Sequence, residues 1–181
     1  MAPQKSYGYK KKMKIAIVGH SYINRMPKIF FTRATIRKFC YGGAHASSFP
    51  DSDQFLDLQE FDPDIIYLQI GGNDINRHSD PEIIFQDILG LVWQWNYGRR
   101  TIPILVGEIE KRTKPRGMTI NQYDSQRRYL NDLLEEEFGD KFVRFSFVMN
   151  HYLSSDGVHL TEEGSYRFSK DIRTHLKQYL K

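Results

Sequence analysis

Short apolar runs recur along the chain at spacings that predict the strands of a β-sheet. The run from Ile15 to Val18 is uninterrupted and ends at Gly19, which is typical of a buried strand. The run at residues 34–40 alternates, and three of the five runs end in a glycine-containing turn. The predicted strands cover residues 14–18, 34–40, 64–70, 101–106 and 141–147.

Apolar residues at helical spacing separate the later strands. The triplet Asp-Pro-Glu at residues 80–82 supplies an N-cap, a first-turn proline and a first-turn acid, which together indicate the start of a helix. Gly139 marks the end of a second helix. The predicted helices cover residues 80–95, 123–138 and 161–180, with two shorter ones directly after residue 21 and near residues 54–60.

Strands that alternate with helices in this way predict an α/β fold. Such a chain forms a parallel sheet, here of five strands, with helices packed on both of its faces. In sheets of this kind, ligands bind beyond the carboxyl ends of the strands. The loops that follow the predicted strands are therefore the places where functional residues are expected.

The net charge of +4 is concentrated near the amino terminus. The first 14 residues hold five of the 26 basic residues and no acid, so 21 bases and 22 acids remain in the rest of the chain. We predict that residues 1–12 are a disordered basic tail and that residues 13–181 form one domain. The tail is either a solvated terminus, which we favour, or a segment that contacts nucleic acid or an anionic surface.

Cysteine content and hydropathy bear on where the protein works. Cys40 is the only cysteine, so no disulfide can form within the chain. The apolar run after the first lysines is too short for a signal peptide, and no apolar stretch approaches the ~20 residues of a membrane helix. We therefore expect an intracellular, cytoplasmic protein, and the sequence leaves its oligomeric state open.

The loops after the first three predicted strands carry residues suited to acyl transfer. Ser21 offers a hydroxyl nucleophile, and Gly43 lets its backbone N–H approach a substrate closely. Asn73 offers a side-chain amide donor. Together with the N–H of Ser21, the donors of Gly43 and Asn73 would form an oxyanion hole. Gly42 is the alternative to Gly43 as the backbone donor.

The loop before the last predicted helix supplies a base and an acid. His159 can accept the proton of the serine hydroxyl and return it to the leaving alcohol. Asp156, three residues earlier, can accept a hydrogen bond from the other imidazole nitrogen and stabilise the imidazolium. Ser21, His159 and Asp156 are therefore the predicted catalytic residues, and Asp74 is predicted to be structural.

These residues form four short motifs, each after a predicted strand: Gly19-His20-Ser21, Gly43, Gly71-Gly72-Asn73-Asp74 and Asp156-Gly157-Val158-His159-Leu160. In order and spacing the motifs resemble the SGNH hydrolases, also called GDSL-like lipases and esterases. The resemblance implies a three-layer α/β/α flavodoxin-like fold and metal-free ester hydrolysis without a cofactor. It implies a substrate that is a small acyl or acetyl ester or a lipid. The chain is also similar to esterase domains encoded in retrotransposons.

One position departs from the family pattern and leaves a second hypothesis open. His20 stands where the family usually has aspartate, a change that alters loop hydrogen bonding or makes activity depend on pH. With the basic tail and the basic loop at residues 111–117, it leaves open the alternative of a catalytically decayed or moonlighting module that binds nucleic acid or lipid. That loop either grips an anionic ligand or is merely solvated. The spacing of His151, Asp156 and His159 matches no strong zinc pattern, so no metal site is predicted.

Overall fold

In the computed structural model, which describes residues 11–97 and 101–180, five strands form one sheet with only parallel pairs. The strand order is β2-β1-β3-β4-β5, which places β1 and β3 at the centre. The predicted α/β class and the parallel five-stranded sheet are confirmed. The strands are β1 (Met13–Gly19), β2 (Ala34–Cys40), β3 (Ile65–Gln69), β4 (Ile104–Gly107) and β5 (Phe142–Val143).

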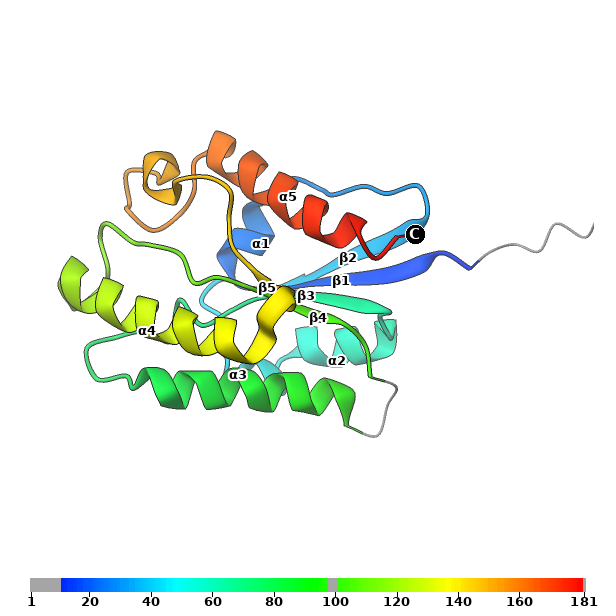
Figure 1. Cartoon of the computed structure of the whole chain (residues 1–181), viewed down its shortest axis with the longest axis horizontal. Helices are drawn as coiled ribbons and strands as arrows, with labels where there is room; N and C mark the ends of the chain where they lie inside the picture. The colour runs from blue at the N-terminus through cyan, green and yellow to red at the C-terminus, as the bar shows by residue number, and fades with distance from the viewer. Residues whose placement is uncertain (1–10, 98–100, 181) are drawn as a thin grey trace, which may run out of the picture.

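Helices cover both faces of the sheet and complete a three-layer α/β/α arrangement (Figure 1). Helices α1 and α5 pack on one face, and α2, α3 and α4 pack on the other. Three short 3₁₀ turns lie between these elements. The helices are α1 (Ser21–Arg25), α2 (Asp53–Phe61), α3 (Pro81–Asn96), α4 (Ile120–Phe138) and α5 (Glu162–Lys177).

The alternation of side chains along the strands divides the core into two halves. Ile15 and Ile17 of β1 pack with α1 and α5, whereas Ala16 and Val18 pack with α2, α3 and α4. Every residue of β3 and β4 is buried, which explains why these strands read as continuous apolar runs. The buried strands of the sheet therefore anchor the loops at its carboxyl edge.

Two predicted strands were too long. The fourth begins at Ile104 rather than at residue 101, directly after Pro103, which has no N–H to donate to a neighbouring strand. The fifth covers only Phe142–Val143 rather than residues 141–147. Beyond it, the N–H of Phe145 donates to the Glu108 carboxylate at 2.9 Å, so its hydrogen bond goes to a side chain instead of a strand.

Little of the predicted tail can be compared with the structure. Only Lys11 and Lys12 of residues 1–12 fall among the described residues, and both precede β1 without regular structure. The remainder of the tail lies outside the described residues. Over the described part of the chain, no helix combines the length and the apolar character that crossing a membrane requires.

Candidate active site

A cleft of about 610 Å³ lies at the carboxyl edge of the sheet. It is bounded by the loops that follow β1, β2, β3 and β4 and by the loop that precedes α5. The residues predicted to form the site all line this one cleft, namely Ser21, Gly43, Asn73, Asp156 and His159. The fold therefore brings together residues that are widely separated in the sequence.

The turn between β1 and α1 positions Ser21. A Cβ on Gly19 would lie 2.1 Å from the carbonyl oxygen of Gln69, so only glycine fits where β1 passes β3. The N–H of His20 donates to the same carbonyl at 3.3 Å and fixes the turn. Ser21 is then the first residue of α1, and its Oγ lies 3.1 Å from Nε2 of His159. That distance allows direct proton transfer between the two side chains.

Asp156 holds the opposite side of the His159 ring. Its Oδ2 lies 2.6 Å from Nδ1 of His159. Its Oδ1 accepts hydrogen bonds from the N–H groups of Val158 and His159 and from the Ser154 hydroxyl, at 2.8–2.9 Å. The bond with the His159 side chain, followed by the two backbone bonds, lowers the pKa of Asp156. The result is a continuous hydrogen-bonded chain from the Asp156 carboxylate to the Ser21 hydroxyl.

Further contacts fix the loop that carries His159. The N–H of Ser154 donates to the carbonyl of His159 at 2.7 Å, which closes the loop on itself. Thr161 caps α5 with its side chain, as its position before the apolar helix predicts. The Tyr22 hydroxyl of α1 donates to the carbonyl of Val158. That last bond joins the element that carries Ser21 to the loop that carries His159.

The motif after β3 is tied to the loop after β2. Asn73 Nδ2 donates to the carbonyl of Ala44 at 3.1 Å, and Asn73 Oδ1 accepts from Arg112 Nη2 at 2.8 Å. Arg112 thereby fixes the orientation of the Asn73 amide. The second N–H of Asn73 Nδ2 remains available to a ligand. Asp74 Oδ1 accepts from the N–H of Ala46 at 3.0 Å. Asp74 therefore ties the loop after β3 to the loop after β2, which is consistent with the structural role predicted for it.

Both glycines of the second motif line the cleft, but their backbones differ. Gly43 has a φ of +78°, a region that residues with a Cβ rarely adopt, whereas Gly42 has no positive φ. A Cβ on either residue would meet nothing within 4 Å. Backbone conformation rather than space is therefore what requires glycine at position 43.

His20, which stands where the resembled family usually has aspartate, caps the short helix α1. Its Nδ1 accepts a hydrogen bond from the N–H of Tyr22 at 3.4 Å, and its ring packs edge-on against the Tyr22 ring. Burial, with smaller contributions from Arg112 and His159, lowers the pKa of His20 to about 3. His20 is therefore neutral at neutral pH, and of its two predicted effects the structure favours the one on loop hydrogen bonding.

Basic side chains that the sequence analysis treated only in part also line the cleft. Arg112, Lys114 and Arg116 come from the basic loop between β4 and α4. Arg25, at the end of α1, was missed. The spacing could have revealed it, because residues four apart on a helix share a face and Ser21 is four residues earlier.

The described residues contain no group of three or more His, Cys, Asp or Glu side chains arranged to hold a metal ion. His151 lies exposed in the 3₁₀ turn at Met149–Tyr152. His159 and Asp156 instead bond to each other. Asp156, His159 and Ser21 thus form one chain of contacts along which a proton can move.

The fold is shared with solved acylhydrolases, lipases and esterases. A proposed acylhydrolase from Bacteroides fragilis has a TM-score of 0.75 and 19% identity, covering 93% of this chain and 88% of that one. A GDSL-like lipase from Bacteroides thetaiotaomicron gives 0.69 and 16%, covering 92% and 87%. A carbohydrate esterase of family 3 from Talaromyces cellulolyticus gives 0.65 and 14%, covering 93% and 98%.

These comparisons confirm the predicted three-layer α/β/α fold, since nearly all of the chain is covered by an acylhydrolase, a GDSL-like lipase and a carbohydrate esterase of the same fold. Neither a protein-family model nor a curated protein sequence matches the chain. The resemblance to retrotransposon-encoded domains gains no support from the neighbours and stays a prediction.

Proposed function

We propose that the chain is a serine ester hydrolase with Ser21 as nucleophile, His159 as general base and Asp156 as the carboxylate that orients His159. The observation that carries the proposal is the pair of contacts on the His159 ring. Ser21 Oγ lies 3.1 Å from Nε2, and Asp156 Oδ2 lies 2.6 Å from Nδ1. A hydroxyl, an imidazole and a carboxylate in this order are what acyl transfer to serine requires.

The first half of the reaction forms an acyl-enzyme. Ser21 Oγ attacks the ester carbonyl carbon while its proton moves to Nε2 of His159. The negative charge on the former carbonyl oxygen is stabilised by the N–H groups of Ser21 and Gly43 and by the Asn73 amide. When the intermediate collapses, the bond to the alcohol oxygen breaks and His159 returns the proton to the departing alcohol.

The second half of the reaction repeats these steps with water. His159 takes a proton from the water as its oxygen attacks the acyl carbon, and the proton then returns to Ser21 Oγ as the acid leaves. Asp156 stays ionised throughout, because its hydrogen bonds lower the pKa of its carboxyl group. It thereby holds the imidazole in the required tautomer and offsets the charge of the imidazolium.

The composition of the cleft supports a small or polar acyl group. Among the described residues that line it, only Ile75 and Val158 carry aliphatic side chains. A long alkyl chain requires an extended apolar channel in which to leave water. We therefore propose short acyl or acetyl esters as the substrates.

Hydrolysis of 4-nitrophenyl acetate tests the proposal. We expect Ser21→Ala to lower kcat by about 10⁴- to 10⁶-fold. The residual activity would come from substrate binding and the oxyanion hole. Ser47→Ala is the matched control, because Ser47 is exposed, lies outside the cleft and should leave the rate unchanged. A folded wild-type chain that hydrolyses no short ester, yet binds RNA in a salt-dependent way that survives Ser21→Ala, would favour the binding-module hypothesis instead.

A further inference from the structure

Four cationic side chains converge on the cleft from two segments of the chain. Arg25 is the last residue of α1, four residues after the predicted nucleophile Ser21. Arg112, Lys114 and Arg116 come from the loop between β4 and α4. These elements flank Ser21 and Asn73, so the cationic groups border the place where an ester would react.

Among the residues that the structure describes, no acid in the cleft is left to neutralise these cations. Asp156 is the one described acid in the lining, and both of its oxygens are engaged by His159 and neighbouring donors. Glu110, a buried acid near Arg112, does not compensate at neutral pH, since burial raises its pKa to about 8. The cleft therefore has an excess of positive charge in a chain whose bases and acids are otherwise nearly balanced.

The four cations are engaged to different extents. Arg112 is held by Asn73 and by the Tyr123 ring, with its Cζ 5.3 Å from the ring centroid, and Lys114 Nζ donates to the Ser155 carbonyl at 2.7 Å. The side chains of Arg25 and Arg116 make neither a hydrogen bond nor an ion pair with any residue that the structure describes. These two guanidinium groups are free to take a ligand.

Arginines elsewhere show what this side chain does when an acid is within reach. Arg127 pairs with Asp124 at 2.8 Å, and Arg167 pairs with Glu163 at 2.9 Å. A guanidinium presents parallel N–H groups that match the two oxygens of a carboxylate or phosphate. The same groups at Arg25 and Arg116 face a cleft rather than a neighbouring acid.

We propose that the substrate carries an anionic oxygen group, a carboxylate or a phosphate, which Arg25 and Arg116 bind beside the scissile ester. Lys114 and Arg112 add to the positive potential that draws such a molecule into the cleft. The inference rests on the proposed ester hydrolysis and names the substrate class of the same site. It also assigns a function to Arg25, a residue outside the four motifs.

Matched acetyl esters test the inference. The esters of 4-hydroxybenzoate and of 4-hydroxyphenyl phosphate carry the anion, and the ester of methyl 4-hydroxybenzoate is their neutral counterpart. With each rate normalised to spontaneous hydrolysis, we expect kcat/KM to be about tenfold or more higher for an anionic ester at low salt, with the preference shrinking at high salt. The better of the two anionic esters identifies carboxylate or phosphate as the preferred group.

Substitution of the free arginines sharpens the test. We expect Arg25→Gln combined with Arg116→Gln to lower the anionic-to-neutral ratio by about tenfold, mainly through a higher KM for the anionic ester. Arg33→Gln is the matched control, because Arg33 is exposed and precedes β2 at the opposite edge of the sheet. Equal normalised rates for anionic and neutral esters, with no change of ratio in the double variant, would overturn the inference and leave the esterase proposal standing.

A binding measurement separates the two proposals if turnover fails. Calorimetric titration of folded Ser21→Ala with 4-acetoxybenzoate and with its methyl ester measures recognition without chemistry. Tighter binding of the anion, lost in the Arg25→Gln and Arg116→Gln background, supports the inference even if the wild-type chain proves inert. Equal binding of the two esters overturns it whatever the activity.

Discussion

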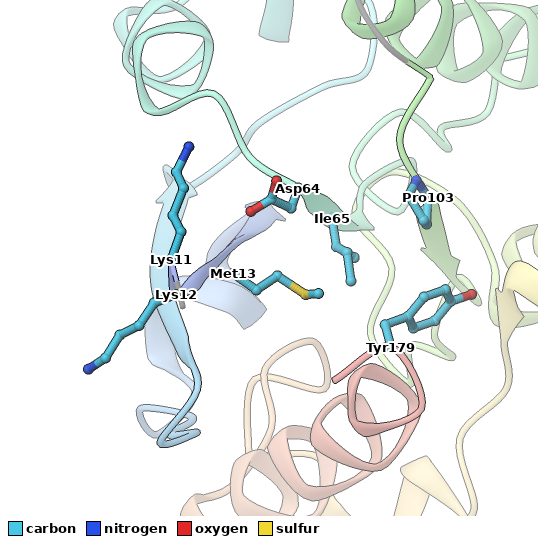
Figure 2. Close-up of a pocket in the computed structure, with 7 residues that line it drawn as sticks. All are labelled: Lys11, Lys12, Met13, Asp64, Ile65, Pro103 and Tyr179. Atoms are coloured by element: carbon cyan, nitrogen blue, oxygen red, sulfur yellow. The ribbon is translucent and has the colours of Figure 1, made fainter. Parts of the chain in front are cut away.

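The two ends of the sheet each carry a hollow, but only the one at the carboxyl end brings together the side-chain groups that acyl transfer requires. At the amino end, Met13, Ile65 and Tyr179 surround a hollow of about 430 Å³ (Figure 2). The ammonium groups of Lys11 and Lys12 point away from each other there. At the carboxyl end, a hydroxyl, an imidazole, a carboxylate and an amide converge on one cleft.

The difference shows that convergence identifies the site better than size does. Ser21 and His159 are 138 residues apart in sequence and in hydrogen-bond contact in space. Parallel strands produce this effect at one edge only, because all of their carboxyl ends point the same way. The amino end receives the opposite ends of the same strands. Its hollow is lined by Met13, Ile65, Pro103 and Tyr179 together with the charged residues Lys11, Lys12 and Asp64.

The carboxyl end also holds most of the buried polar side-chain atoms that lack a hydrogen-bond partner among the described residues. Among the described residues, four buried side-chain atoms lack a hydrogen-bond partner, and three of them belong to its loops. These are His20 Nε2, Asp74 Oδ2 and Glu110 Oε1. Buried polar groups without partners destabilise a fold, and such groups gather at functional sites. The two ends of the sheet therefore differ both in the side-chain groups they bring together and in the number of buried polar atoms that lower the stability of the fold.

After Ser21→Ala, the largest loss of activity should come from Asp156→Asn. We expect kcat for 4-nitrophenyl acetate to fall by about 10³- to 10⁴-fold, because an amide neither fixes the tautomer of His159 nor balances its positive charge. Stopped-flow or steady-state absorbance measures the loss. A fall of less than about threefold would remove Asp156 from the proposed mechanism.

Asn73→Ala should have the next largest effect. Loss of one oxyanion donor is expected to lower kcat by about 10²- to 10³-fold with a small change in KM. The split between kcat and KM distinguishes lost transition-state stabilisation from lost binding. If KM rises and kcat holds, Asn73 binds the ground state and the oxyanion hole has another donor.

Glu110→Gln tests the stability side of the comparison. Burial raises the pKa of Glu110 from 4.5 to about 8, so the folded chain keeps a proton that the unfolded chain releases. The wild type therefore loses stability as pH rises from about 4.5 to 8, and Glu110→Gln should not, gaining about 1–3 kcal/mol relative to it.

Urea unfolding at pH 5 and pH 8 measures this gain. Glu136→Gln is the control, since Glu136 is an exposed acid on α4 and should show no such pH-dependent gain. Parallel pH profiles for Glu110→Gln and the wild type would show that Glu110 is ionised in the folded chain near neutrality.

The smallest effect is expected at the amino end, from Asp64→Asn. The Asp64 carboxylate accepts the backbone N–H of Lys14 at 2.7 Å, and a neutral amide oxygen accepts it more weakly. We expect unfolding to become easier by about 1 kcal/mol while kcat/KM stays within about twofold. A large loss of activity would break the contrast between the two ends.

The sequence predicts well which residues line the cleft, because its signals are local. Gly19 and Gly43 mark positions where a Cβ would clash or where φ is positive, and Thr161 marks a helix start. Such signals act within a few residues, so they can be recognised in the sequence without knowledge of the fold. The order of the four motifs then supplies the topology.

Contacts between distant segments could not be predicted in the same way. The short fifth strand depends on Glu108 taking the N–H of Phe145 across 37 residues. The orientation of the Asn73 amide depends on Arg112, 39 residues later. Both are tertiary contacts for which several partners are available in the sequence, and no local sequence pattern determines which partner is used.

Covalent labelling of Ser21 tests the central claim most directly. A fluorophosphonate forms a stable adduct only with a serine whose hydroxyl a neighbouring base activates. We predict a single adduct, mapped to Ser21 by peptide mass spectrometry, that persists in Ser47→Ala and disappears in Ser21→Ala. A folded chain that remains unlabelled, or an adduct on a different serine, would contradict the account.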